Sequence, residues 1–183
     1  MTRRTHIRNE ILVLRCQQGD GDAFADLAQR WQTRLWRHAY HVTGDRDAAS
    51  DVVQDSWLAV MKGIRRLHDA DAFPTWAFRI VTNKSRDWAR RQHRRWRLRE
   101  WLTRHERQLD TRPDPQDDRV DSLRAALACL TADQRALITL YYQEGFTTQE
   151  VADILAIPRG TVKSRLYHAR DRIRRQMEDE TDA

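Results

Sequence analysis

Two carboxylates four residues apart, Asp51 and Asp55, have the types and spacing that could do chemistry. On one side of a helix, their oxygens could chelate a divalent cation. No third ligand, glycine-rich phosphate loop or Ser/His/Asp set accompanies them in the sequence. We therefore predict no catalytic residue, no metal and no cofactor. This argues against an enzyme of nucleic acid, such as a nuclease or a recombinase.

The two cysteines and a histidine pair also give no sign of a metal site. Cys16 and Cys129 lie far apart in sequence and outside any Cys-x-x-Cys or Cys/His cluster. We expect both to be reduced, buried small residues without a disulfide or zinc. His38 and His41 could share a helix face, and without further ligands nearby we expect a surface or half-buried pair.

Two short amphipathic helices joined by a tight break are predicted between residues 146 and 175. The first begins with a capping box, in which the side chains of Thr147 and Glu150 each satisfy a backbone N–H group. Pro158 cannot continue that helix but suits the first turn of a second. The second helix repeats apolar residues at helical spacing, at Val162, Leu166, Ala169 and Ile173. This is the sequence form of a helix-turn-helix.

The outer face of the second helix suits the major groove of DNA. Advancing 100° per residue from Val162 places Ser164, Tyr167, His168 and Asp171 opposite the core, with cations on both flanks. Arg159 and Thr161 lie at the helix N-terminus, where a phosphate is favoured. The candidate DNA contacts are Arg159, Thr161, Lys163, Ser164, Arg165, Tyr167, His168 and Arg170. A charged, solvated helix is the alternative, but the cap, the proline and the neutral polar ridge together favour DNA.

Positive charge is concentrated in two segments of the 183-residue chain, whose formal net charge is +6. Residues 79–107 hold eleven Lys/Arg against three acids, and residues 159–175 hold seven against one. Two basic segments predict two separate contacts on nucleic acid. No run approaches the ~20 apolar residues that span a bilayer, and no signal-peptide apolar region follows the charged start. We therefore expect a cytoplasmic protein without membrane insertion.

The helix-turn-helix segment also resembles a known family. Its sequence, TTQEVADILAIPRGTVKSRLYHARDRIR, is similar to the last conserved region of bacterial extracytoplasmic-function sigma factors, and its GTVKSRL core followed by AR is quite specific to them. The resemblance extends in order over roughly residues 10 to 175. It implies that the second helix recognises the −35 element of a promoter.

The segment from Arg46 to about Lys62 is predicted to form a helix with two different faces. Ala49, Val53, Trp57 and Val60 point one way, and a mostly polar set points another. Spacing alone is also compatible with a solvated face. The block DRDAASDVVQDSWLAV, however, resembles the part of the family that grips the clamp helices of core RNA polymerase. The resemblance implies polymerase binding by Asp51, Gln54, Asp55 and Leu58.

Aromatic and basic residues alternate in the next predicted helix, whose first turn is marked by Pro74. Phe73, Trp76, Phe78 and Trp88 stand among cations, a mixture typical of surfaces that stack on exposed bases, although some rings must be core. Trp76 and Ile80 share a face and are expected to be mostly buried. The segment FPTWAFRIVTNKSRDWARR resembles the family region that melts and reads the −10 element. By that match the −10 contacts are His68, Asp69, Ala70, Asp71, Asn83, Lys84, Arg86, Arg90 and Arg91.

The predicted fold is all-α, with two small helical domains joined by a flexible linker. Residues 111–118 combine two prolines with several acids and cannot form a compact element. We divide the chain into an N-terminal sigma domain at 1–107, a linker at 108–118 and a C-terminal helix-turn-helix domain at 119–183. A second capping box, Thr131 with Gln134, is expected to start a helix that runs to Gly145.

Together these features predict an alternative sigma factor that binds core RNA polymerase and directs promoter-specific initiation on promoter DNA. A free-standing helix-turn-helix regulator is the alternative, and it would bind duplex DNA tightly without polymerase. The resemblance further implies an anti-sigma factor that restrains the protein.

Overall fold

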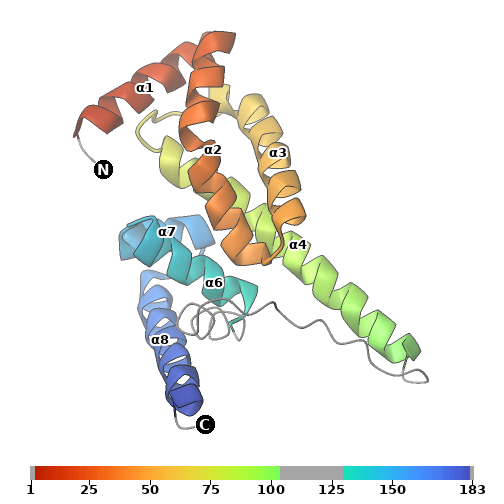
Figure 1. Cartoon of the computed structure of the whole chain (residues 1–183). Coiled ribbons are helices and arrows are strands. Elements are labelled where there is room, and N and C mark those ends of the chain that lie inside the picture. The colour runs from red at the N-terminus through yellow and green to blue at the C-terminus, as the bar shows by residue number, and fades with distance from the viewer. Residues whose placement is uncertain (1–2, 104–129, 182–183) are drawn as a thin grey trace.

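The computed structural model describes residues 3–103 and 130–181, with side chains from 9–95 and 130–175, and all regular structure in these residues is helical. The N-terminal domain comprises α1 (Arg3–Gln17), α2 (Gly21–Thr43), α3 (Arg46–Gly63), the 3₁₀ turn η1 (Ile64–Arg66) and α4 (Phe73–Thr103). The C-terminal domain comprises α6 (Ala132–Ile138), the π-helical turn η2 (Thr139–Gln143), α7 (Thr148–Leu155) and α8 (Arg159–Thr181). The prediction of an all-α fold with two helical domains is confirmed (Figure 1). The predicted linker, 108–118, lies outside the described residues.

The predicted helix boundaries follow from local capping. Asp20 and Asp45 accept hydrogen bonds from the backbone N–H groups of Ala23 and Ala48, at 3.0 and 2.9 Å, and so start α2 and α3. Gly44 ends α2 in the left-handed conformation, with φ of 75°. Helix α1 begins at Arg3. Short-range contacts therefore fix the starts of α2 and α3 and the end of α2.

Both predicted capping boxes of the C-terminal domain are present. Thr131 with Gln134 starts α6, and Thr147 with Glu150 starts α7. Helix α7 ends at Ala156, which adopts the left-handed conformation with φ of 52° and ψ of 48°. This turn, followed by Pro158, separates α7 from α8 and completes the helix-turn-helix.

Trp31 of α2 is the centre of the N-terminal core. Its ring makes edge contacts with Phe73 and Phe78 of α4, at centroid distances of 5.8 and 6.3 Å. Both phenylalanines are fully buried, so they are among the rings that belong to the core and cannot stack on bases. Trp76 and Ile80, expected to be mostly buried, are each half-buried. The outer face of α4 thus offers fewer aromatic rings than the sequence indicated.

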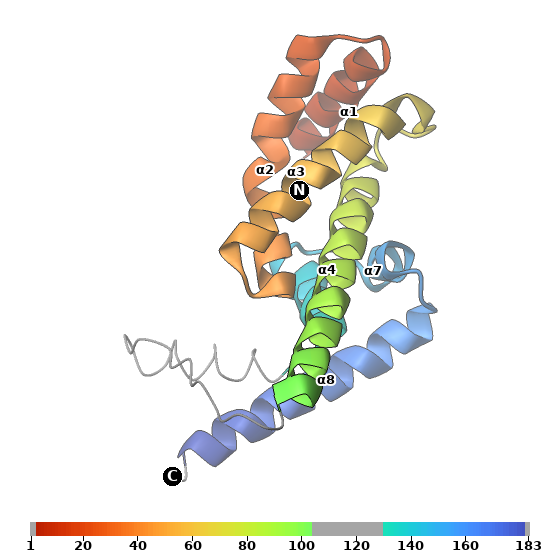
Figure 2. The same cartoon turned by 90° about the vertical axis from the view of Figure 1, so that its right-hand side faces the viewer.

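The two domains pack directly against each other. Phe78 of α4 meets Phe146, which precedes α7, with ring centroids 5.1 Å apart. Leu137 and Leu140 of the C-terminal domain join the same hydrophobic core cluster as Leu35 of α2. Figures 1 and 2 show α6 and α7 beside α2 and α4, with α8 at the opposite end of the molecule from α1. One apolar core therefore runs through both domains.

His38 lies inside the interface between α2 and α4. Its Nε2 atom is 2.8 Å from the Thr82 hydroxyl oxygen, and its side chain is fully buried, so the expectation of a surface or half-buried residue was wrong. Burial, with a smaller contribution from the charge of His41, lowers the pKa of the His38 imidazole to about 3. Cys16 is free and buried as expected, whereas Cys129 lies outside the described residues.

Replacing Ala156 by glycine is expected to stabilise the protein, because alanine pays a steric cost in the left-handed region that glycine avoids. Glycine also loses more conformational entropy on folding, and this cost offsets part of the gain. We therefore expect a net increase of about 0.5–1 kcal/mol in the free energy of unfolding, measured by urea denaturation. The same change at Ala89, inside α4, should instead destabilise by about 1 kcal/mol. A loss of stability in Ala156→Gly would contradict this explanation.

The burial of His38 predicts a loss of stability in acid. A histidine with a lowered pKa in the folded state binds its proton mainly in the unfolded state, so its contribution is complete above about pH 6.5 and falls as the pH drops below that. Between pH 7 and 5 we expect His38 alone to reduce the free energy of unfolding by about 2 kcal/mol. His38→Gln, which can still bond Thr82, should remove this part of the pH dependence in urea titrations. An unchanged slope in that variant would assign the titration to other groups.

Candidate nucleic-acid and partner interfaces

Helix α8 separates its buried and exposed faces as predicted. Val162, Leu166 and Ala169 are buried against the rest of the C-terminal domain, and Ile173 is half-buried. Every candidate DNA contact on this helix is exposed except Thr161, which is half-exposed; the set is Arg159, Thr161, Lys163, Ser164, Arg165, Tyr167, His168 and Arg170. A polar ridge flanked by cations is therefore presented to solvent on one helix.

Local contacts hold several of these side chains in place. Arg159 donates from Nε to the Thr148 hydroxyl at 3.2 Å, which links the start of α8 to the start of α7. Tyr167, 62% exposed, lies edge to face with His168 at 5.6 Å. Asp171 accepts from Arg174 at 3.3 Å and lies 2.8 Å from Arg175, so the ridge ends in a partly neutralised carboxylate.

Helix α4 carries a polar stripe on the side away from its core. Val81, Thr82 and Ser85 are buried, whereas Asn83 is exposed. Arg79, Asn83, Arg86 and Arg90 follow one another at spacings of four, three and four residues, which places them on one face. Arg91 is exposed beside this stripe, and Lys84 is half-buried. The candidate −10 residues of α4 thus surround an outward-facing amide.

The remaining −10 candidates lie in the loop that leads into α4. His68, Asp69 and Asp71 are exposed and Ala70 is half-buried. The Asp69 carboxylate accepts from the backbone N–H of Asp71 at 2.9 Å, and this short-range bond shapes the loop. Asn83 lies ten residues after Phe73, a rise of about 15 Å along α4. The loop and Asn83 therefore lie at different levels of one surface.

The polar face of α3 is exposed as predicted. Asp51, Gln54, Asp55 and Leu58 all face solvent, and Leu58 is 47% exposed. Gln54 and Leu58 border a hollow between α2 and α3 that is also lined by Phe24, Gln32, Ser50, Trp57 and Met61. Trp57 is held there by a 2.6 Å hydrogen bond to Gln32 and an edge contact with Phe24. An apolar hollow beside carboxylates suits a protein partner better than DNA.

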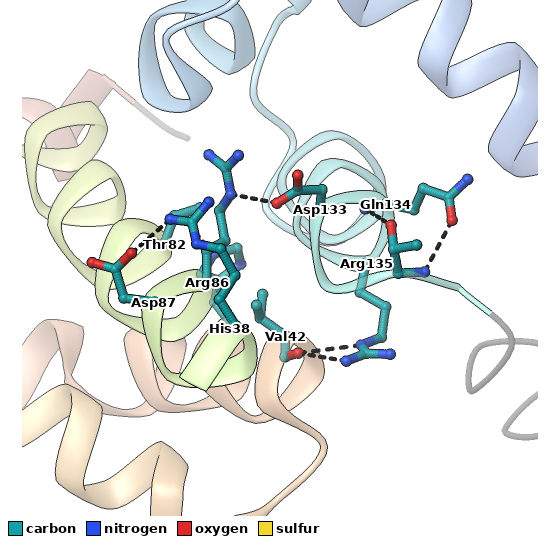
Figure 3. A network of polar contacts seen from close by, with 10 residues as sticks. His38, Val42, Thr82, Arg86, Asp87, Asp133, Gln134 and Arg135 are labelled. Atoms are coloured by element: carbon teal, nitrogen blue, oxygen red, sulfur yellow. Dashed lines mark hydrogen bonds and ion pairs between the residues drawn. The ribbon is translucent and has the colours of Figure 1, made fainter. Parts of the chain in front are cut away.

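Two ion pairs connect these candidate surfaces to other parts of the molecule. Lys84 lies 3.7 Å from Asp55, so the −10 and polymerase candidates meet at the α3 and α4 boundary. Arg86 donates to Asp133 of the C-terminal domain (Figure 3). Within the residues whose side chains are described, no three His, Cys, Asp or Glu residues gather as a metal site would require. The described helices also include none that is long and apolar enough to cross a membrane.

Comparison with known proteins decides the family. Residues 27–95 match sigma-70 region 2, and residues 121–173 match sigma-70 region 4. The chain is 30% identical over 190 aligned residues to the ECF RNA polymerase sigma-E factor of Haemophilus influenzae, covering 94% of this chain and 96% of that protein. The chain belongs to the ECF sigma factors. The rival interpretation as a free-standing helix-turn-helix regulator is thereby set aside.

Solved structures share the fold of this sigma factor. CnrH, solved with the cytosolic domain of CnrY, superposes with a TM-score of 0.70 at 24% identity, over 94% of this chain and 98% of that one. The sigma factor RpoE of Bartonella quintana, solved with the anti-sigma factor NepR, gives 0.62 at 24% identity, over 84% and 97%. At this level of identity the likeness concerns the fold alone.

Sequence reasoning left out several residues of these surfaces. Arg79 belongs to the stripe of Asn83, and its spacing of four residues was the available signal. Met61, 53% exposed, extends the hollow and follows Leu58 by three residues. The contacts of Arg86 with Asp133 and of Arg34 with Glu144 span 47 and 110 residues, and no local pattern indicates them.

Proposed function

We propose that this sigma factor binds core RNA polymerase and directs initiation at its own class of promoter. In this proposal α8 reads the −35 element, the outer face of α4 with the loop before it opens and reads the −10 element, and α3 binds polymerase. The division of labour follows residues 1–107 and 119–183, with 108–118 as the connection. The protein itself performs no covalent chemistry.

One observation carries the proposal: α8 buries an apolar stripe while it exposes Ser164, Tyr167 and His168 between cations. Hydroxyl and imidazole groups can bond base edges, and cations on both flanks can meet the two phosphate backbones of a major groove. A solvated bundle helix would not need a neutral ridge between charged flanks.

The partners follow from the family and from the surfaces. The α3 face, with its carboxylates and apolar hollow, is the proposed polymerase contact. The Bartonella quintana neighbour was solved with an anti-sigma factor, and we propose that a protein of that class restrains this chain too.

Run-off transcription tests the proposal as a whole. Purified core polymerase with this chain, on a genomic template library, should give discrete transcripts that share −35 and −10 sequences. Core polymerase alone is the control. Tight duplex binding by the chain without polymerase, and no discrete transcripts with it, would refute the function.

Substitutions on the ridge of α8 and on its flanks should affect promoter binding in different ways. Tyr167→Ala and His168→Ala should relax sequence preference at −35 by roughly 1–3 kcal/mol for each base that the side chain no longer bonds. Lys163→Ala should weaken binding to all promoters alike. It should also reduce the slope of log affinity against log salt concentration by about one. Run-off competition between −35 variants measures the change in preference, and affinity for a single promoter over a series of salt concentrations measures the uniform loss and the slope.

The matched control for Tyr167→Ala is Tyr142→Ala. Tyr142 is also an exposed tyrosine, at 50%, but it lies in η2 and not on α8. It should leave promoter preference unchanged. Unchanged −35 preference in both Tyr167→Ala and His168→Ala would remove these residues from the groove.

The α3 face gives a prediction on polymerase affinity. Asp51→Arg with Leu58→Ala should reduce affinity for core polymerase by roughly tenfold or more, because it reverses a charge and deletes an apolar side chain. Asp51 is preferable to Asp55, since Asp55 also lies 3.7 Å from Lys84. Leu14→Ala, another exposed leucine at 51%, is the control. If the double variant is folded by circular dichroism and still binds polymerase with normal affinity, this face of α3 is not the polymerase contact.

A further inference from the structure

Arg86 belongs to the polar stripe of α4 that we propose reads the −10 strand. It already forms an ion pair with an acidic residue of the C-terminal domain. Its Nε donates to a carboxylate oxygen of Asp133, the second residue of α6, and its side chain is 16% exposed (Figure 3). Its neighbour Arg90 pairs instead with Asp87 of its own helix, and Arg91 is exposed. A carboxylate offers an arginine the same sign of charge and the same kind of acceptor oxygens as a phosphate.

Two further polar contacts hold the C-terminal domain, which carries Asp133, against the N-terminal domain. Arg135, two residues later, donates from Nε and Nη2 to the carbonyl oxygen of Val42 at 3.2 and 2.8 Å. Arg34 pairs with Glu144 at 2.7 Å, and its guanidinium lies over the rings of Trp31 and Phe78. The Glu144 side chain is 7% exposed, so this pair is largely withdrawn from solvent. The acid is therefore presented by a fixed surface and not by a loose chain.

This closed arrangement is incompatible with simultaneous binding of both promoter elements. The positions −35 and −10 are about 25 base pairs apart, roughly 85 Å at 3.4 Å per pair. Helix α4, at 31 residues, is only about 46 Å long, and α6 and α7 contact it directly. The two domains must separate before each reaches its element, and Asp133 leaves Arg86 when they do.

We infer that Asp133 takes the place of a strand phosphate at Arg86 while the sigma factor is closed. The ion pair withholds one cation of the −10 surface until the C-terminal domain moves away. Strand binding and domain closure then compete for the same guanidinium. This inference rests on the proposed function, because it assigns Arg86 to the strand backbone.

The test uses the full chain and a labelled oligothymidine, whose phosphates probe the backbone site without requiring a promoter sequence. Asp133→Asn should bind it about fivefold more tightly at about 0.1 M salt, because Arg86 is then free to bind one more phosphate. The plot of log affinity against log salt should steepen by about 0.7. Asp133→Ser, which also suits a helix start, serves as a second variant.

Two comparisons isolate the ion pair. Asp153→Asn makes the same change in net charge at an exposed position of α7, where the carboxylate bonds only Gln149 among the hydrogen bonds the structure shows, and should change affinity less than twofold. Adding Arg86→Gln to Asp133→Asn should abolish both the tighter binding and the steeper slope. Equal effects of Asp133→Asn and Asp153→Asn, or tighter binding that survives Arg86→Gln, would overturn the inference.

Run-off transcription by the wild-type chain separates this result from the proposed function. If the wild type gives transcripts but Asp133→Asn binds oligothymidine no differently from Asp153→Asn, the inference is wrong and the proposed function stands. The expected binding changes without polymerase-dependent transcripts would support the ion pair and refute the function.

Discussion

The packing of Phe78 is the interaction on which the rest of this structure depends. Its ring, fully buried, lies within 6.3 Å of Trp31 and 5.3 Å of His38, between centroids, and beneath the guanidinium of Arg34. On its other side it meets Phe146 at 5.1 Å. One side chain of α4 therefore belongs at once to the core of the N-terminal domain and to the contact between domains.

That placement also orients the outer surface of α4. With Phe78, Val81 and Ser85 turned inward, the 100° rotation per residue turns Arg79 and Asn83 outward. A rotation that freed Phe78 would bury part of the polar stripe. The buried phenylalanine thus fixes which residues of the same helix can meet a nucleic-acid strand. Helix α8 follows the same rule, since burial of Val162 and Leu166 determines that Tyr167 is exposed.

The sequence was sufficient wherever the deciding interaction spans about four residues. Both capping boxes, the two faces of α3 and the stripe of α8 depend on such spacing, and the structure confirms them. His38 was wrongly expected at or near the surface, and the sequence did not single out Phe78 as a core residue. An amphipathic pattern in one helix does not show which of its faces a second helix will cover. The pair of Arg34 and Glu144 spans 110 residues and depends on the packed domains, so no local signal could have indicated it.

The closed arrangement combines interactions that differ in what they contribute. The pair of Arg34 and Glu144 loses hydration on burial, which offsets much of its attraction, so it fixes register more than it adds stability. The contact of Phe146 with Phe78 contributes through apolar burial, at most about 1.5–3 kcal/mol for the Phe146 ring on opening, because Phe78 keeps its contacts with Trp31 and His38 in the N-terminal core.

The free-energy cost of exposing the Phe146 ring would favour the closed state by roughly 10- to 10²-fold. A single phosphate at Arg86 supplies less than this. Opening therefore requires a partner that covers a larger surface or binds several sites of the open form. In the proposed function, polymerase at α3 together with duplex DNA at α8 would meet that requirement, whereas single-stranded DNA alone would not. Assembly with polymerase would then open the domains first, and the polar stripe of α4 would become fully available only afterwards.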